Sequence, residues 1–582
     1  MIQTTRKFIN LSSNLLARKQ NDILLASLVI MISYSASLIL GLLRQRLMGS
    51  VFFDCCAVDL DAFQAAFRLP DLIFQTVVSG ILATSCIPIF AQRFSQSSTK
   101  GSQVATSILM FLLTIMIGFA ILVIIFAPML ARLMTVNFST SQITTMANLM
   151  RIIFSAQIIF LFSNWIGTLL QTMKRFIAPA LAPITYNIGI ISGIVFLSKP
   201  LGIYGPAVGV VLGALMHLVV QIVVLRQTEF SFTSGWSIWN KDVKEVLLIS
   251  WPRLLTQASV QLESNLTMYF ASSLAAGSLF LFDLAALLRQ VPVQIVGLAI
   301  GQAAFPSLSE YAHNNSPQFK KIAQDTFMQM YYLVLPLTSI LLILRIPIVR
   351  LAFGTASFPW AATKETAYTL GIFTILIPSL VLSQLLLRSY YAYKNTKTPM
   401  VIHLSSLALF SVIGWISINQ LQFFGQVINP INVINTPWLN LTLFNFDNPL
   451  QALAYAVVFT ALVRTSLIFW FIRDKMISNL QRFRLEFLKL TSAGAIMIIS
   501  LWIPFQFLDR LVFDTTRVIP LVALTFTTSA IGFVVYIISC HILDIQAQHT
   551  IWKLLIKFPG FGTLVNKTQS WMSSPIPEIN NP

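Results

Sequence analysis

Apolar runs long enough to cross a membrane alternate with short polar segments from about residue 22 to residue 540. A run of about 20 apolar residues predicts a transmembrane helix, because a helix of that length spans the hydrocarbon core of a bilayer. We predict about 14 such helices, at 22–43, 62–92, 104–131, 145–172, 178–198, 203–225, 245–272, 277–308, 325–352, 366–392, 399–419, 450–472, 487–507 and 517–540. Several are longer than a bilayer is thick and contain proline, which indicates kinked or tilted helices. The predicted fold class is therefore an all-α integral membrane protein.

The second half of this pattern repeats the first. Arg68-Leu-Pro70 in the second predicted helix matches Arg289-Gln-Val-Pro292 in the eighth, and the loop 174–179 matches the loop 394–399. Six helices return the chain to the side on which it started, so the copies form two six-helix lobes related about an axis along the membrane normal. Two such halves are typical of a transporter whose site lies between them.

The repeat defines the domain organisation. We predict a cytoplasmic basic amphipathic segment at 1–20, an N-lobe at 21–230, a C-lobe at 240–475 with an outside insertion at 421–448, two further helices within 485–541, and a cytoplasmic tail at 542–582. The first segment could lie on the membrane surface as a helix or be a basic tail without structure, and its sequence fits both.

The net charge of +18 reflects 38 lysines and arginines against 20 acidic residues. Most of the basic residues fall on cytoplasmic segments if the N-terminus is cytoplasmic, which predicts that both termini are inside. The basic excess therefore indicates topology and anionic lipid headgroups rather than nucleic acid. Only 10% of the residues are charged, against about 25% in a soluble chain, so we expect no large soluble domain.

No enzyme or metal motif is present: there is no HExxH, no GxSxG, no P-loop and no pair of carboxylates on one helix face. The chain therefore reads as a transporter without a bound cofactor. It would be driven by a coupling cation (sodium or proton) or by the membrane potential, because an ATPase needs a phosphate-binding loop. The five histidines are scattered and fit packing or interface positions. Adjacent Cys55 and Cys56 are not expected to form a bridge, and no zinc site is indicated.

Charges inside apolar spans are the best functional candidates, because each costs about 2.5–3.5 kcal/mol at the centre of a helix. Asp61, Arg68 and Asp71 share one face of the second predicted helix. They could gate a pathway or bind a headgroup, or they could form an ion pair within that helix. Arg253 and Glu263 share a face of the seventh predicted helix.

Further arginines lie near the ends or within the spans. Arg44 could turn toward a cavity, whereas Arg46 is expected to extend to lipid headgroups. Arg289 and Arg464 lie within spans of the second half, and Arg464 is the better structural candidate. Several arginines facing a cavity would suit an anionic, lipid-linked substrate, because a guanidinium group binds phosphate through two parallel hydrogen bonds.

Several stretches carry a family resemblance. They are Leu40-Gly-Leu-Leu-Arg44, Asp61-Ala-Phe63, Ala66-Phe-Arg-Leu-Pro70, Gly80 to Pro88, Arg175-Phe-Ile-Ala-Pro-Ala-Leu-Ala-Pro183, Asn187-Ile-Gly189, Phe270-Ala-Ser272, Ala276-Gly-Ser278, Pro292, Gly297, Ala299, Pro306-Ser-Leu-Ser309 and Tyr391 to Pro399. In these segments, within about 30–475, the chain resembles the MurJ (MviN) family of lipid II flippases in the multidrug/oligosaccharidyl-lipid/polysaccharide exporter superfamily. The resemblance implies fourteen helices in two lobes with both termini inside.

The resemblance also implies a function. The chain would carry undecaprenyl-pyrophosphate-linked peptidoglycan precursor across the bacterial cytoplasmic (inner) membrane by alternating access. Its partners would be that lipid-linked precursor, membrane lipids and candidate cell-wall synthesis proteins. We assign substrate binding to Arg44, Arg68, Arg253 and Arg289, and gating or ion coupling to Asp61, Asp71 and Glu263.

The chain departs from the family at positions where the resemblance implies cavity arginines. Those positions hold Leu38, Phe74, Gln75 and Leu287, so the headgroup is bound differently or the substrate has changed. Three alternatives therefore stay open. They are a flippase for another lipid-linked oligosaccharide, a cation-coupled small-molecule exporter, and a non-transporting scaffold. The exporter needs carboxylates in its cavity, and the spans hold few of them.

Overall fold

The computed structural model describes residues 23–82, 86–232, 237–312, 316–419, 448–512 and 517–556. Across these ranges the chain is helical apart from short turns, which confirms the predicted all-α class. Within them, 12 helical segments are long and apolar enough to cross a membrane. The predicted segment 1–20, nearly all of the insertion 421–448 and the end of the tail lie outside the described residues.

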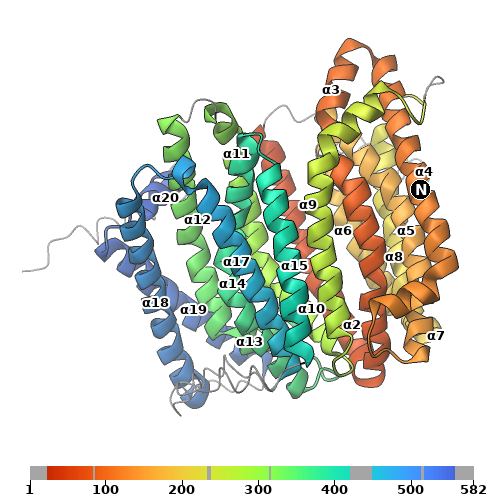
Figure 1. Ribbon diagram of the computed structural model, residues 1–582. Helices are drawn as coiled ribbons and strands as arrows, with labels where there is room; N and C mark the ends of the chain where they lie inside the picture. Colours follow the sequence, from red (N-terminus) through yellow and green to blue (C-terminus); the bar gives the residue numbers. More distant parts are fainter. Residues whose placement is uncertain are drawn as a thin grey trace, which may run out of the picture. The chain divides into compact units, whose positions relative to one another are not determined.

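Figure 1 shows the helices, which follow one another along the chain. The α-helices are α2 (Ile23–Ile73), α3 (Ile87–Gln96), α4 (Ser98–Met134), α5 (Thr140–Thr172), α6 (Ile177–Ser192), α7 (Ser198–Leu201), α8 (Tyr204–Leu225), α9 (Lys241–Ala271), α10 (Ser278–Pro292), α11 (Ala299–Tyr311), α12 (Pro317–Ile343), α13 (Arg345–Phe353), α14 (Trp360–Ala392), α15 (Lys397–Asn419), α17 (Pro449–Met476), α18 (Leu480–Leu511), α19 (Val518–Ile542) and α20 (Gln546–Ile556). Three π-helical segments join them: η1 (Phe74–Ser79), η3 (Gly193–Leu197) and η4 (Val293–Leu298).

The fold divides into two compact units. The first holds the described residues up to Leu288 together with Val349–Ile372 and Thr396–Arg464. The second holds Arg289–Ile348, Phe373–Asn395 and the described residues from Thr465 onward. The candidate residues Arg44, Asp61, Arg68, Asp71, Arg253 and Glu263 lie in the first unit, and Arg289 lies in the second.

The predicted spans correspond closely to these helices, with two differences. The first two predicted spans are continuous in α2 and η1, and they count as one apolar segment, Ser35–Ser79. Helix α9 matches the seventh predicted span, but it is more polar than the 12 apolar segments and is not among them. The number of crossings and the orientation of the chain stay predictions.

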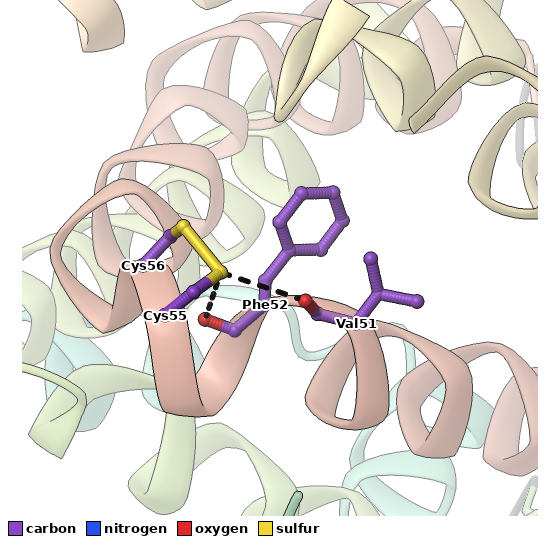
Figure 2. Close-up of a disulfide and its surroundings, with 4 residues drawn as sticks. All are labelled: Val51, Phe52, Cys55 and Cys56. Atoms are coloured by element: carbon purple, nitrogen blue, oxygen red, sulfur yellow. Dashed lines mark hydrogen bonds between the residues drawn. A yellow bond between two sulfur atoms is a disulfide. The ribbon is translucent and has the colours of Figure 1, made fainter. Parts of the chain in front are cut away.

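The break within α2 lies at Cys56, and it corrects the expectation that Cys55 and Cys56 stay unbridged. The structure joins the two sulfurs in a disulfide (Figure 2). Successive side chains of a regular helix point about 100° apart, which is why we expected no bond. Cys56 instead leaves the helical conformation, at φ −148° and ψ 40°. In the predicted orientation this turn is outside, where disulfides form readily.

The repeated loops end their helices in the same way. Lys174 after α5 and Lys394 after α14 both adopt a left-handed conformation, at φ 59° and 55°. The next residue, Arg175 or Asn395, donates its backbone N–H to the carbonyl of Leu170 or Tyr390, at 2.8 Å and 3.0 Å. This is the Schellman pattern of a helix C-terminus. The two loops that the sequence matched therefore have the same backbone conformation.

The prolines of the repeat also act alike. Pro70 precedes η1, and Pro292 precedes η4. Proline has no N–H to donate to the carbonyl four residues earlier, so the helix after it must rearrange, and a π-helical turn is one way to do so. The prediction that these two helices depart from regular geometry is confirmed.

Glycines let α6 and α8 approach very closely in the first unit. A Cβ atom on Gly189 would lie 2.2 Å from the Cα of Gly213, and one on Gly193 would lie 2.6 Å from the Cα of Gly209. Backbone cannot move aside as a flexible side chain can, so neither contact tolerates a larger residue. Small residues serve this purpose in membrane helices, where close backbone packing holds the helices together.

Aromatic side chains hold the predicted extra helices in the second unit. The ring of Tyr331 on α12 stacks on that of Phe487 on α18, with centroids 4.5 Å apart. The hydroxyl of Tyr536 on α19 donates to the carbonyl of Tyr332 at 2.8 Å. Helices α18 and α19 therefore pack on α12 through specific contacts within that unit.

Candidate functional site

Arg68 forms the centre of a polar cluster inside the first unit. Its Nη2 atom lies 2.6 Å and 2.8 Å from the two carboxylate oxygens of Asp283, and its Nη1 atom donates to the Ser264 hydroxyl at 2.7 Å. The side chains of Arg68 and Asp283 are only 22% and 20% exposed. Arg68 thereby joins α2, in the first predicted copy of the repeat, to α9 and α10, which are both in the second.

Arg44 and Asp71 extend this cluster along α2. The charge of Arg44 acts on Asp71 and Tyr186, and Asp71 is also under the influence of Arg68. Asp71 accepts a hydrogen bond from Gln157 of α5 at 2.7 Å. Arg68 and Asp71 make hydrogen bonds to other helices, so the cluster extends beyond the second predicted helix.

Asp61 has a different environment, although it shares a helix face with Arg68. It is 4% exposed and accepts hydrogen bonds from the backbone N–H groups of Gly277, at 2.6 Å, and Phe280, at 3.1 Å. Gly277 has a φ of +85°, which glycine adopts without steric cost. Asp61 therefore holds the start of α10, where a negative charge meets the positive end of the helix.

Glu263, the predicted coupling residue of α9, pairs with Arg464 of α17 in the same unit. The two side chains are 13% and 12% exposed, so this ion pair is largely shielded from solvent. The structural role expected for Arg464 agrees with this contact. The same pair occupies the carboxylate of Glu263, which would otherwise be open to a cation.

Of the other two predicted arginines, only Arg289 has a side chain within the described residues. Arg253 lies on α9, but its side chain is outside the described residues. Arg289 belongs to the second unit, where its guanidinium group lies 4.4 Å from the centre of the Phe373 ring. A cation over an aromatic face is stabilised by the ring's negative centre. Arg44 and Arg68 are thus the predicted binding residues that the structure brings together.

Arg46 corrects a further expectation. Instead of extending to lipid headgroups, it donates to the carbonyl oxygens of Leu351, at 2.9 Å, and Gly354, at 3.0 Å. These carbonyls belong to the end of α13 and the turn after it. Arg46 therefore ties α2 to that turn.

A further ion pair, which the sequence did not indicate, joins α3 to the start of α9. Arg93 contacts Asp242 at 2.6 Å and Glu245 at 3.8 Å. In the predicted orientation this pair is cytoplasmic, whereas Asp61 and Arg46 lie toward the outside. Contacts between the two copies of the repeat are therefore present near both ends of the first unit.

Asp283 is the functional candidate that sequence reasoning missed. It is an acidic residue within an apolar span, which is the signal used for Asp71 and Glu263, and it could have been found in the same way. Its pairing with Arg68 could not, because the two residues are 215 positions apart. In this cluster carboxylates lie beside the arginines. An arginine in such a place can exchange its carboxylate partner for another anion, such as a phosphate group.

The chain matches the family model described as "MurJ: Lipid II flippase MurJ" over residues 49–515. A probable lipid II flippase MurJ of Bdellovibrio bacteriovorus is 29% identical over 409 residues, which cover 68% of this chain and 76% of that protein. The lipid II flippase MurJ of Burkholderia cenocepacia is 24% identical over 407 residues, which cover 68% and 78% of the two chains.

Solved structures show the same fold. A lipid II flippase MurJ in an inward closed conformation matches with a TM-score of 0.68 and 19% identity, over 88% of this chain and 98% of that one. An inward-facing multidrug resistance MATE family transporter of the MOP superfamily matches with a TM-score of 0.61 and 12% identity, over 77% and 98%. The helical architecture is therefore shared with transporters of this superfamily.

Proposed function

The chain belongs to the MurJ family of lipid II flippases, and we propose that it carries lipid II from the inner to the outer leaflet by alternating access. It is a multi-span protein of the bacterial cytoplasmic membrane, and its activity is transport. Its substrate is a lipid-linked cell-wall precursor. The lipid tail would stay in the bilayer while the pyrophosphate and its sugar–peptide headgroup cross through the protein.

The observation that carries the proposal is the contact of one guanidinium nitrogen of Arg68, Nη2, with both carboxylate oxygens of Asp283 within a membrane-spanning unit. A pyrophosphate presents oxygens with the spacing of a carboxylate, so it can replace Asp283 on the same guanidinium group. The exchange keeps Arg68 paired throughout, because either Asp283 or the substrate supplies the negative charge. An uncompensated charge at this depth is thereby avoided.

Arg44 would bind the headgroup together with Arg68. Asp71 lies under the influence of both arginines, so it would reduce their excess charge when no substrate is present. Release of Asp283 would also free α10 from α2, since Arg68 is bound to both α10 and α9. Substrate binding is thus linked to the contact between the two copies of the repeat, as alternating access requires.

Coupling belongs to the same proposal. The membrane potential or a cation gradient would drive the cycle, with Asp61, Asp71 and Glu263 as candidate coupling groups. Asp61 and Glu263 are each engaged in this conformation, by the start of α10 and by Arg464. Either would have to leave its partner in order to bind a cation. Cell-wall synthesis proteins are the candidate protein partners.

The test is complementation of bacteria depleted of their own lipid II flippase, combined with lipid II translocation in vesicles. The unaltered chain should rescue growth and move lipid II. Arg44→Ala and Arg68→Ala should each lower translocation by about tenfold or more, because each removes a charge-assisted contact worth about 1.5–3 kcal/mol. Arg132→Ala is the matched control, since Arg132 is an exposed arginine at the end of α4.

Failure to rescue, with the chain shown to be folded in the membrane and inactive toward lipid II in vesicles, would contradict the proposal. Translocation of another lipid-linked oligosaccharide in the same vesicles would then identify a different substrate on the same fold. A chain that moves neither but still binds cell-wall enzymes would indicate the scaffold role.

A further inference from the structure

A cavity of about 270 Å³ lies among α5, α6, α8 and the helix that follows Pro70. Its lining includes Asn164, Gly167, Thr168, His217 and Gln221, and among the described lining residues His217 is the one titratable side chain. Liquid water takes up roughly 30 Å³ per molecule, so a polar cavity of this size has room for several. It is separate from the Arg68 cluster, and none of its lining residues was a predicted site residue.

Three buried side chains at this cavity form a chain of hydrogen bonds. Gln221 Nε2 donates to the Ser163 hydroxyl oxygen at 2.9 Å, and that oxygen lies 2.5 Å from His217 Nδ1. Ser163, His217 and Gln221 are 0%, 8% and 1% exposed. Gln221 Nε2 also lies 3.3 Å from His217 Nδ1, and an amide N–H can only donate, so Nδ1 is taken as the acceptor for both the Gln221 amide and the Ser163 O–H. This assigns His217 as neutral, with Nδ1 accepting and the proton on Nε2.

The amide oxygen of Gln221 is left without a partner in this arrangement. It is buried, and no hydrogen-bond donor contacts it. A buried acceptor without a donor is costly, so its presence calls for an explanation. Gly167 provides the space beside it, because a Cβ atom there would lie 2.8 Å from Gln221 Oε1.

Addition of one proton to His217 gives a second complete arrangement. His217 Nδ1–H would then donate to Ser163, and the Ser163 O–H would turn to the Gln221 oxygen after rotation of the amide. The Gln221 amide N–H groups would face the cavity and its water. The direction of the chain reverses, and the unpartnered oxygen receives a donor.

We propose that this cavity is a proton-binding site, in which His217 takes a proton from hydronium in the cavity while Ser163 and Gln221 reverse their hydrogen bonds. Hydronium gives up one proton and becomes water, and the imidazole becomes imidazolium. The use of this site in transport rests on the proposed function, whereas the binding of the proton does not.

Four helix ends lie at the cavity. Thr168 and Gln171 lie in the last turns of α5 and Gln221 lies near the end of α8, and the partial negative charge of these C-termini favours the imidazolium. Pro179 and Ile87 lie at the starts of α6 and α3, where the partial positive charge opposes it. Of the elements packed against His217, α6 contributes the Tyr186 phenol, behind the Phe160 ring, and α7 contributes the exposed Lys199. The Cys86 thiol precedes the cavity residue Ile87. Arg175, in the turn after α5, donates to the carbonyl of Gln227.

The direct test is ¹⁵N NMR of the full-length, histidine-labelled protein in bilayers, titrated from about pH 3 to about pH 8, because burial disfavours the charged imidazole and an exposed histidine already changes charge between about pH 5 and about pH 8. The resonance lost in His217→Gln is assigned to His217. We expect its Nδ1 signal to move from the unprotonated to the protonated position as the pH falls. Should His217→Gln fail to fold, a variant that keeps His217 and replaces the other four histidines by glutamine makes the assignment.

Gly167→Ala gives the matched test of the mechanism, because the added methyl group occupies the space that Gln221 needs. We expect it to shift the midpoint of the His217 titration, whereas Gly118→Ala should not, since no atom lies within 4 Å of a Cβ at Gly118. Ser163→Ala should shift the midpoint too. A His217 signal that stays constant across the range would overturn the proposal.

Translocation in vesicles then tests its use in transport. Unaltered protein should change its rate several-fold between about pH 5.5 and about pH 7.5, and His217→Gln should give a flat profile. Proton binding at His217 with no translocation at any pH would count against the proposed function and leave the proton site standing. Translocation with the same pH profile in both proteins would overturn a role for this site in transport.

Discussion

Helices α2 and α10 each carry an arginine shortly before a proline and a π-helical segment after it, yet the two guanidinium groups have different surroundings. Arg68 is held by Asp283 and Ser264, whereas Arg289 lies over the ring of Phe373. The backbone features repeat because proline and glycine repeat. The charged partner of Arg68 is a single acidic residue, Asp283.

This comparison indicates that the two copies share a π-helical segment after the proline but differ in the contact that their arginine makes. An arginine paired with a carboxylate can exchange that partner for phosphate at constant charge, as proposed for Arg68. The contact of Arg289 with the Phe373 ring, which carries no net charge, is worth about 0.5–2 kcal/mol. The following predictions test that difference.

The largest difference is expected when the partner of each arginine is removed. Asp283→Ala leaves Arg68 in a largely shielded place without its carboxylate, which should destabilise the protein by about 3 kcal/mol. Phe373→Leu, the corresponding change at Arg289, should cost about 1 kcal/mol through the lost ring contact. Thermal unfolding of both variants in one detergent measures the difference. Equal losses would contradict the division between the two arginines.

Asp61 shares a helix face with Arg68, but we expect it to stabilise the start of α10 rather than to bind the headgroup. Asp61→Ala removes the acceptor for the start of α10 and should cost about 1–2 kcal/mol. Asp61→Asn keeps an acceptor oxygen, so most of that stability should remain. Unfolding midpoints of the two variants compare the effects. If Asp61→Asn is as stable as the parent but no longer translocates lipid II, a coupling role would replace the capping role.

The repeated glycines are expected to differ for a simple steric reason. A methyl group on Gly80 would meet the end of the Leu254 side chain at 2.7 Å, which can move aside. One on Gly297 would meet the Val381 backbone at 3.2 Å, which cannot. Gly297→Ala should therefore lower the free energy of unfolding by about 1 kcal/mol more than Gly80→Ala does. A larger loss at Gly80 would show that Leu254 is fixed in place.

The smallest effects should be equal in the two copies. Lys174 and Lys394 both adopt the left-handed conformation at matching helix ends. Glycine has no Cβ and relieves the steric cost there, so Lys174→Gly and Lys394→Gly should each stabilise the protein by up to about 1 kcal/mol. Denaturation of each variant provides the measurement. A gain at one site and a loss at the other would mean that the two turns are not equivalent.

The sequence predicted the features that depend on local pattern. Apolar runs gave the helices, repeated prolines indicated the irregular turns after Pro70 and Pro292, and the matching loops indicated the parallel repeat. The residue pairs Arg68–Asp283, Arg93–Asp242 and Glu263–Arg464 lie 149 to 215 positions apart. The periodicity of one helix shows on which face a residue lies. It does not show which residue of another helix that side chain contacts.

Two errors had local causes that could not be read from spacing. Cys55 and Cys56 were judged by regular helical geometry, and the break at Cys56 removes that premise. Arg46 was expected at the membrane surface because it ends a span, but two backbone carbonyls of a distant turn accept its hydrogen bonds. Such carbonyls carry no signal in a sequence. The contact between His217 of α8 and Ser163 of α5 also carries no signal in the sequence, because it depends on how the two helices pack.

The most direct test of the account is a comparison of lipid II translocation by Arg68→Ala and Arg289→Ala in vesicles of the same composition, each at matched amounts of folded protein. The account predicts that Arg68→Ala lowers the rate by about tenfold or more, as the loss of a charge-assisted contact implies, and that Arg289→Ala retains most of it. Equal losses, or a larger loss for Arg289→Ala, would contradict the assignment of headgroup binding to the Arg68 cluster.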